Sequence, residues 1–286
     1  MISERTEEYD AFGPWLLKVA TAEEIPRVFR SHPVDLAAAH LVLKVPRLIE
    51  RRDATPAMHL YDRLLILDGD GLEVLTRAGD GFTSRRIPAR AVLAVDSGTE
   101  LLGGRLVVHA TDGRTISVGF SGSSLPLVTD LADGLIGLAT GGPRTPGASD
   151  AVDRHALGRG DVGLVTAYRA LTLRWAGLRV LEAYPGEVLV AKEPRGKRLL
   201  HRRPRLSGAI ICSDGPHLIV QSHRDWLRAS PRPDLSERRL VILRSRVTGV
   251  ESAPHPDVHG ATSVLLRSGS AAVELVVPDG HVPDLR

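Results

Sequence analysis

The chain has 286 residues, of which 43% are apolar and 25% charged, as in a soluble globular protein with room for two hydrophobic cores. No apolar run approaches the ~20 residues of a transmembrane helix, and the polar, acidic residues 1–8 are unlike a secretory signal. The single cysteine, Cys212, cannot form an internal disulfide. We therefore expect a cytoplasmic protein without a transmembrane segment.

The charge is uneven along the chain. Residues 1–150 contain 16 Lys or Arg and 20 Asp or Glu, a net charge of −4, whereas residues 151–286 contain 21 and 14, a net charge of +7. A basic second half permits binding to phosphate-bearing surfaces. Only four of the 37 basic residues are lysines, which is typical of genomic base bias and weakens the functional interpretation of single arginines.

The first segments predict a strand, a short helix and a second strand. Residues 15–19 are apolar enough for a strand. Thr21 and Glu24 match a capping box, and the apolar residues after them would share one helical face. Residues 41–45 predict a buried strand.

Two hairpins and a helix follow. Residues 64–67 and 72–76 flank Asp68-Gly69-Asp70-Gly71, and residues 106–110 and 115–120 flank Asp112-Gly113. Asp-Gly between apolar strands is the strongest local hairpin signal, because both central positions favour positive φ. Residues 124–139 then predict a helix with Ser124 as its N-cap.

The Gly- and Pro-rich residues 141–150 predict a linker between a first domain, 1–140, and a second domain, 151–286. The second domain begins with an amphipathic helix at 162–176, whose apolar residues are spaced 4, 3, 4 and 3 apart. Residues 178–183 and 188–191 then predict strands.

The chain also contains an internal repeat. The pattern Lys-x-Pro-Arg follows an apolar strand at Lys44 and again, 148 residues later, at Lys192. Three further segments recur in the same order, with offsets of 145, 155 and 157–158: 64–75 with 209–220, 91–95 with 246–250, and 106–118 with 264–275. This order predicts a duplicated domain. The second copy has no counterpart of helix 124–139, so we expect helix 162–176, or a neighbouring subunit, to cover its open end.

Strand meanders that end in one amphipathic helix resemble the pleckstrin-homology-like fold. The resemblance covers about 13–139 and, less completely, 178–277. It implies a mainly β (α+β) chain with two tandem, partly open β-barrels, each associated with one or two helices. The tryptophan typical of the closing helix is missing from 124–139. Only Lys197 with Arg203-Pro204-Arg205 echoes the family's lipid-reading pattern.

One local feature stands out, the run 195–205, which holds six Lys or Arg among eleven residues. Such a run can bind the phosphates of nucleic acid or of anionic lipid. It can also be a solvated loop, or pair with acidic groups of the first half. The candidate anion-binding residues are Lys192, Arg195, Lys197, Arg198, Arg202, Arg203 and Arg205, with Lys44 and Arg47 in the corresponding loop of the first copy.

Other candidates have simpler interpretations. His255 and His259 flank a carboxylate, but on a Pro-containing loop their spacing does not place them on one face, so we expect no metal site. The serine-containing segment 119–124 matches neither the nucleophile-elbow motif nor the phosphate-loop motif, so we interpret it as a turn followed by a helix N-cap. Trp226 either anchors a partner or caps the barrel.

We therefore expect a non-enzymatic binding or scaffold protein without a cofactor. Its partner would be a protein, a peptide or an anionic lipid surface, and the chain could form a homo-oligomer. Two alternatives remain open. One is a nucleic-acid-binding protein that uses 195–205. The other is an enzyme with a pocket between the halves, which would need convergent titratable groups.

Overall fold

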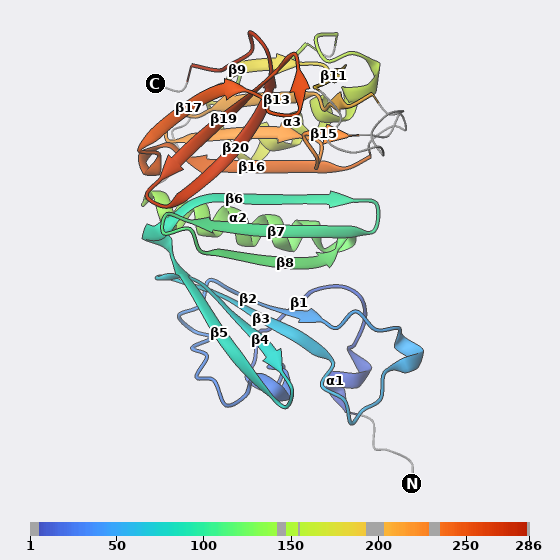
Figure 1. The fold of residues 1–286 in the computed structure, drawn as a ribbon. Helices are drawn as coiled ribbons and strands as arrows, with labels where there is room; N and C mark the ends of the chain where they lie inside the picture. The colour runs from blue at the N-terminus through green and yellow to red at the C-terminus, as the bar shows by residue number, and fades with distance from the viewer. Residues whose placement is uncertain (1–5, 142–146, 154, 193–202, 229–234, 285–286) are drawn as a thin grey trace. The chain divides into compact units, whose positions relative to one another are not determined.

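The computed structural model describes residues 6–141, 147–153, 155–192, 203–228 and 235–284 (Figure 1). The chain is mainly β, as predicted, with several sheets and few helices, and no sheet closes into a barrel among the described residues. No helix in this part is long and apolar enough to cross a membrane.

The chain divides into two compact units. The first comprises the residues up to Val92 with Leu102–Leu106 and Ile116 to the end of the following helix; the second comprises Leu93–Leu101, Val107–Thr115 and the described residues from 147 onward. The second unit thus includes a strand that precedes the segment 141–150 by about 40 residues. The described residues of that segment lie against the second unit, because Gly177 N–H donates to Gly147 O at 3.0 Å.

The first unit is built on a five-stranded antiparallel sheet whose order follows the chain. Its strands are β1 (Leu17–Lys18), β2 (Leu41–Pro46), β3 (Tyr61–Asp68), β4 (Gly71–Ala78) and β5 (Gly81–Pro88). The short helix α1 (Glu7–Asp10) and the 3₁₀ turns η1 (Arg27–Phe29) and η2 (Arg51–Asp53) belong to the segments around it. Apolar residues of these segments, including Phe12, Val28 and Phe29, pack on Leu64, Ile66 and Leu75 of the sheet.

The helix expected to begin at Thr21 does not form, and only η1 is helical in that segment. The capping contacts are nevertheless present, since Glu24 Oε2 accepts hydrogen bonds from Ala20 N at 2.6 Å and Thr21 N at 3.4 Å. The helix fails because Pro26, with ψ 138°, is extended. The hairpin β3–β4 is confirmed, with Leu67 opposite Leu72.

The helix predicted at 124–139 is confirmed as α2 (Leu125–Thr140), preceded by η4 (Gly122–Ser124) and ended by Gly141 at φ 70°. It buries Val128, Leu131 and Leu135 and lies against β3, β4 and η3 (Ala89–Ala91). At Gly134 the approach is so close that an added Cβ would stand 2.8 Å from Leu67 Cδ2. Glycine lowers the intrinsic stability of this helix, so its close packing against the sheet must hold it in place.

The second unit contains two larger sheets. In the first, β6 (Val92–Glu100), β16 (Glu237–Leu243), β14 (His217–Ser222), β13 (Ala209–Ser213) and β9 (Arg179–Tyr184) follow in this order. The strands β7 (Gly103–Ala110) and β8 (Thr115–Ser121), whose residues are divided between the two units, follow β6 on its other side. The second is β17 (Gly249–Pro254), β19 (Ala261–Ser268) and β20 (Ala271–Pro278). Short pairings join β10 (Glu187–Val188), β12 (Arg205–Leu206) and β15 (Leu227–Arg228), and join β11 (Val190–Ala191) to β18 (Val258–His259).

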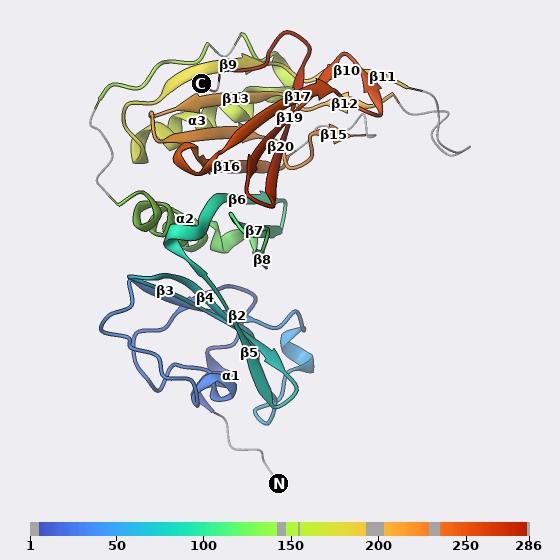
Figure 2. The ribbon, with the colours of Figure 1, turned by 60° about the vertical axis from the view of Figure 1, so that its left-hand side comes forward.

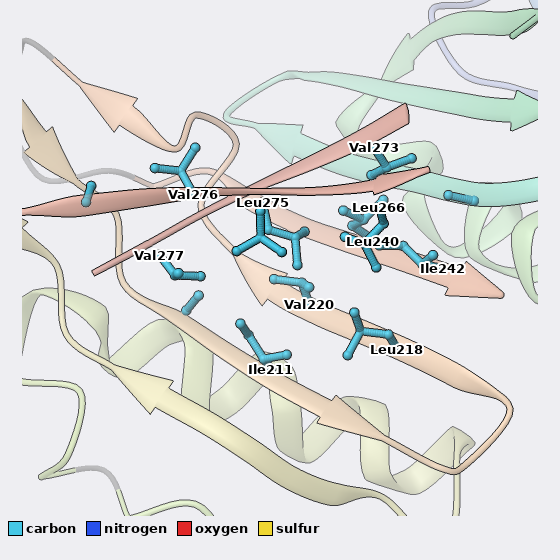
Figure 3. Packing of buried hydrophobic residues seen from close by; sticks show 14 of the residues in the cluster. Ile211, Leu218, Val220, Leu240, Ile242, Leu266, Val273, Leu275, Val276 and Val277 are labelled. Carbon is cyan, nitrogen blue, oxygen red and sulfur yellow. The ribbon is translucent and has the colours of Figure 1, made fainter. Parts of the chain in front are cut away.

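The core of this unit lies between the two sheets, whose strands cross (Figures 1 and 2). Ile211, Val220 and Leu240 project from β13, β14 and β16 toward Leu266 and Leu275 of β19 and β20 (Figure 3). These five side chains are at most 2% exposed. Burial of apolar side chains from both sheets is thus the main force that holds them together.

The amphipathic helix expected at 162–176 is α3 (Val162–Arg174), preceded by η5 (Arg159–Asp161). It contacts β13 and β14, and Trp175, directly after it, places its ring 5.1 Å from that of His217. His217 points to the opposite face of β14 from its neighbour Leu218, which lies in the core between the sheets. The expectation that this helix covers the open end of the second copy is therefore wrong: α3 covers the outer face of the sheet.

The repeat predicted from the sequence has a counterpart in local geometry. Ala89 N–H in η3 donates to Asp70 O at 2.8 Å, and Arg244 N–H in η6 (Arg244–Arg246) donates to Pro216 O at 2.9 Å. The strand registers next to these bonds also correspond, with Leu72 opposite Ile87 and Leu218 opposite Ile242. In both places a hairpin, a strand, a 3₁₀ turn and a further strand follow one another.

Candidate ligand-binding surfaces

The predicted cations of the first unit bind the chain itself. Lys44 is 6% exposed, its Nζ donates to Glu24 O at 3.1 Å, and it stands 5.1 Å from the centre of the Tyr61 ring. Burial lowers the pKa of the Lys44 ammonium, although the carboxylates of Glu24 and Glu8 oppose this. Arg47 Nη1 donates to His59 O at 3.2 Å. Lys44 and Arg47 thus have structural roles within the first unit, in addition to any role in ligand binding.

In the second unit, the predicted cations lie at the ends of short strands. Lys192 Nζ donates to His255 O at 2.8 Å, Arg203 is exposed, and Arg205 is half-buried on β12. Arg195, Lys197, Arg198 and Arg202 lie outside the described residues. The structure therefore shows three of the seven predicted cations of this loop.

Arg205 lies directly opposite Arg228 in the pairing of β12 with β15. Like charges at opposed positions destabilise a pair of strands. The positive charge of Arg228 is partly compensated by its electrostatic attraction to the buried carboxylate of Asp161. No ion pair of Arg205 is seen among the described residues. Two opposed guanidinium groups are a suitable arrangement for an anion.

The two histidines of the sequence pair lie in different surroundings. His255 Nδ1 accepts a hydrogen bond from Asp257 N at 3.2 Å, which stabilises the local turn, and His259 is exposed on β18. Among the described residues, no group of three His, Cys, Asp or Glu side chains could hold a metal ion.

The two possible nucleophiles also have structural environments. Ser124 Oγ accepts a hydrogen bond from Leu16 N at 2.9 Å and so ties the start of α2 to the segment before β1. Cys212 is fully buried on β13. Burial, with the nearby charge of Asp214, raises the pKa of its thiol to about 12, far from the range of a reactive thiolate.

A cavity of about 360 Å³ opens beside the 3₁₀ turn η6 in the second unit. Leu218 and Leu266, which are 0% and 2% exposed, form its floor, and Val250, which is 45% exposed, lies at its rim. Arg244, Val247, Thr248 and Gly249 complete the lining. The cavity combines an apolar floor with a cationic edge.

The position of this cavity corresponds to the place of α2 in the first unit. There, α2 packs against η3 and β4. The equivalent elements η6 and β14 supply Arg244 and Leu218 to the cavity, and the shared turn-to-carbonyl hydrogen bond fixes the equivalence of Ala89 with Arg244. What a helix covers in the first unit is thus an open cavity in the second.

Sequence reasoning noticed the missing helix but did not identify this cavity. The necessary signal lies in the correspondence of 91–95 with 246–250, because the same offset places Arg244 and Arg246 at the positions of Ala89 and Ala91. Replacement of two alanines by two arginines changes the chemistry of the surface on which α2 packs.

No protein-family model matches the chain, and no curated protein matches it in sequence.

Proposed function

We propose that the chain is a non-enzymatic binding protein built from two tandem pleckstrin-homology-like modules, with a protein or peptide as its ligand. The observation that carries this proposal is the open cavity beside η6. Its apolar floor and half-exposed apolar rim are features of a recognition site.

The tandem arrangement is supported by the repeated order of elements. The first module would comprise β2–β5, β6–β8 and α2, and the second β9, β13, β14 and β16 with β17, β19 and β20. The matching hydrogen bonds of Ala89 and Arg244, with the matching strand registers beside them, support a common ancestor for the two modules.

The experiment is selection of peptides from a random display library with the full chain as bait. Enrichment should be lost with Val250→Asp, which places a charge at the apolar rim, and kept with Leu173→Asp, because Leu173 is 89% exposed on α3 and away from the lining. Failure to enrich any peptide, or enrichment that both variants keep equally, would overturn the proposal.

A second candidate function is favoured by the opposed arginines Arg205 and Arg228. We propose it as binding of a phosphate-bearing ligand, either nucleic acid or an anionic lipid surface, next to the predicted loop 195–205. Arg202→Ala/Arg203→Ala should weaken binding to single-stranded RNA, with a steep dependence on salt. No binding to RNA at low salt would eliminate the nucleic-acid version, and no binding to phosphatidylserine vesicles would eliminate the lipid version.

A further inference from the structure

We propose that the cavity beside η6 binds an amphipathic helix of a protein partner, and that this helix carries acidic side chains which pair with Arg244 and Arg246. The inference rests on the proposed function and specifies the partner of the same site.

The helical form of the partner follows from the first unit. There, the equivalent turn η3 and the equivalent strand β4 are covered by α2, which buries one apolar face against them. Val92, the equivalent of Val247, is fully buried there, whereas Val247 is only partly buried. At the place of α2, the second unit therefore has the partly exposed apolar residues Val247 and Val250, but no helix covers them in the part of the chain that is described.

The acidic character of the partner follows from the two substitutions in the turn. In the first unit, Ala89 and Ala91 allow α2 to lie close to η3. At the equivalent positions, Arg244 lines the cavity and its Nη1 donates to Gly215 O at 3.3 Å, and the half-buried Arg246 follows in the same 3₁₀ turn. A carboxylate that lies against a guanidinium group at the edge of the cavity gains charge-assisted hydrogen bonds, which are stronger than hydrogen bonds between neutral groups.

An apolar helix without charges fits this surface less well, because it offers no carboxylate to the guanidinium group of Arg244, which lines the cavity. A membrane surface also fits less well, because the apolar residues form the floor of a cavity instead of projecting from the surface: Leu218 and Leu266 are almost fully buried. An acidic amphipathic helix satisfies both parts of the lining.

The probe for the test is a labelled peptide with the sequence of residues 124–141, which forms α2 in the first unit and contains Asp130 and Asp133. Fluorescence anisotropy with the full chain should show saturable binding. Arg244→Glu/Arg246→Glu should weaken it by about ten-fold or more, because attraction becomes repulsion. The matched control is Arg114→Glu, the same charge change on the hairpin tip between β7 and β8.

A charge exchange makes the test independent of folding defects in the variant. The peptide with Asp130→Lys/Asp133→Lys should bind poorly to the natural chain and regain binding to Arg244→Glu/Arg246→Glu. No binding of the natural peptide up to about 1 mM, or equal binding of both peptides to both chains, overturns the inference. If display selection nevertheless yields peptides that need Val250, the proposed binding function stands and only the acidic helix is wrong.

Discussion

The guanidinium group of Arg238 binds both carboxylate oxygens of Asp96, with Nε 3.0 Å from Oδ1 and Nη2 2.9 Å from Oδ2. The two residues are 142 positions apart and lie on the paired strands β16 and β6. The Arg238 guanidinium also stands 5.0 Å from the centre of the Trp226 ring. This arrangement shows how a strand from the first half of the sequence becomes part of the second compact unit.

The first prediction is that residues 147–286 alone do not form a stable monomer. Without β6, the edge of β16 loses its partner along the register from Glu237 to Ile242, and an uncovered edge strand recruits other chains. Size-exclusion chromatography should show oligomers or aggregates, and thermal unfolding should lose cooperativity relative to the full chain. A monomeric fragment that unfolds cooperatively would contradict the importance of the β6–β16 pairing.

The second prediction concerns the Arg238–Asp96 pair itself. Both side chains are largely buried, at 13% and 20% exposure, so the bidentate pair should contribute about 1–2 kcal/mol of coupling energy. A double-mutant cycle with Arg238→Ala and Asp96→Ala, followed by urea unfolding, measures this quantity. The Arg52–Glu50 pair, with both side chains at least 65% exposed, is the matched control and should show much weaker coupling.

The hairpins and the helices α2 and α3 were predictable because their signals are local. Asp68 to Gly71 specify a tight turn, and the spacing of Val128, Leu131 and Leu135 specifies one buried helical face. The sequence did not predict β5, because half of its residues are exposed and the segment gives no apolar alternation. Nor did it predict the pairing of β6 with β16, since a pairing between strands so far apart depends on tertiary packing.

The site shows the same division between local and non-local signals. The basic run 195–205 was visible as composition, but Lys44 also lies in an apolar–basic pattern and turns out to be buried against Tyr61. The hydrogen bond from the buried Lys44 to the carbonyl group of Glu24, 20 residues away, has no signature in the sequence. The cavity beside η6 requires both the equivalence of the two halves and knowledge of where α2 packs.

The third prediction uses two glycines of one turn. Gly71 has φ 148°, and an added Cβ would stand 2.4 Å from Ile87 O and 2.6 Å from Ala89 N. Gly71→Ala should therefore lower the free energy of unfolding by about 2 kcal/mol or more, because the cost of backbone strain and the cost of the steric clash are additive. Gly69→Ala, two residues earlier, meets nothing within 4 Å and should be nearly neutral. Urea unfolding of both variants makes the comparison, and equal losses would refute this account of the turn.

The fourth prediction is that the only thiol is inert in the folded protein. Since burial raises the pKa of Cys212 to about 12, its reaction with a disulfide reagent at pH 8 should be slow and should become complete in guanidinium chloride. The absorbance of the released thiolate reports both rates. Val250→Cys, at the half-exposed rim of the cavity, should react rapidly under native conditions and is the positive control. Rapid reaction of the unmodified protein would show that β13 is accessible.

The fifth prediction concerns a buried pair at the start of α3. Asp161 Oδ1 lies 3.0 Å from His223 Nε2, and its Oδ2 accepts a hydrogen bond from Gly186 N at 2.7 Å. His223 Nδ1 lies 2.7 Å from Ser236 O. Both ring nitrogens thus face oxygen acceptors, so the geometry favours a doubly protonated ring. Removing one partner should leave an uncompensated buried charge, and Asp161→Asn should cost about 3–5 kcal/mol at pH 7.

The same pair gives the pH dependence a definite sign. Burial raises the pKa of the Asp161 carboxyl, but the hydrogen bonds from His223 and Gly186 and the charge of Arg228 outweigh burial and hold the pKa below its usual value. The carboxylate therefore stabilises the fold fully above its unfolded pKa, and this stabilisation is lost as the pH falls through the lower folded pKa. Urea unfolding between pH 7 and about 3 should show a flatter acid limb for Asp161→Asn than for the natural chain. The exposed Asp257→Asn is the matched control, and identical limbs for Asp161→Asn and the natural chain would contradict the role assigned to Asp161.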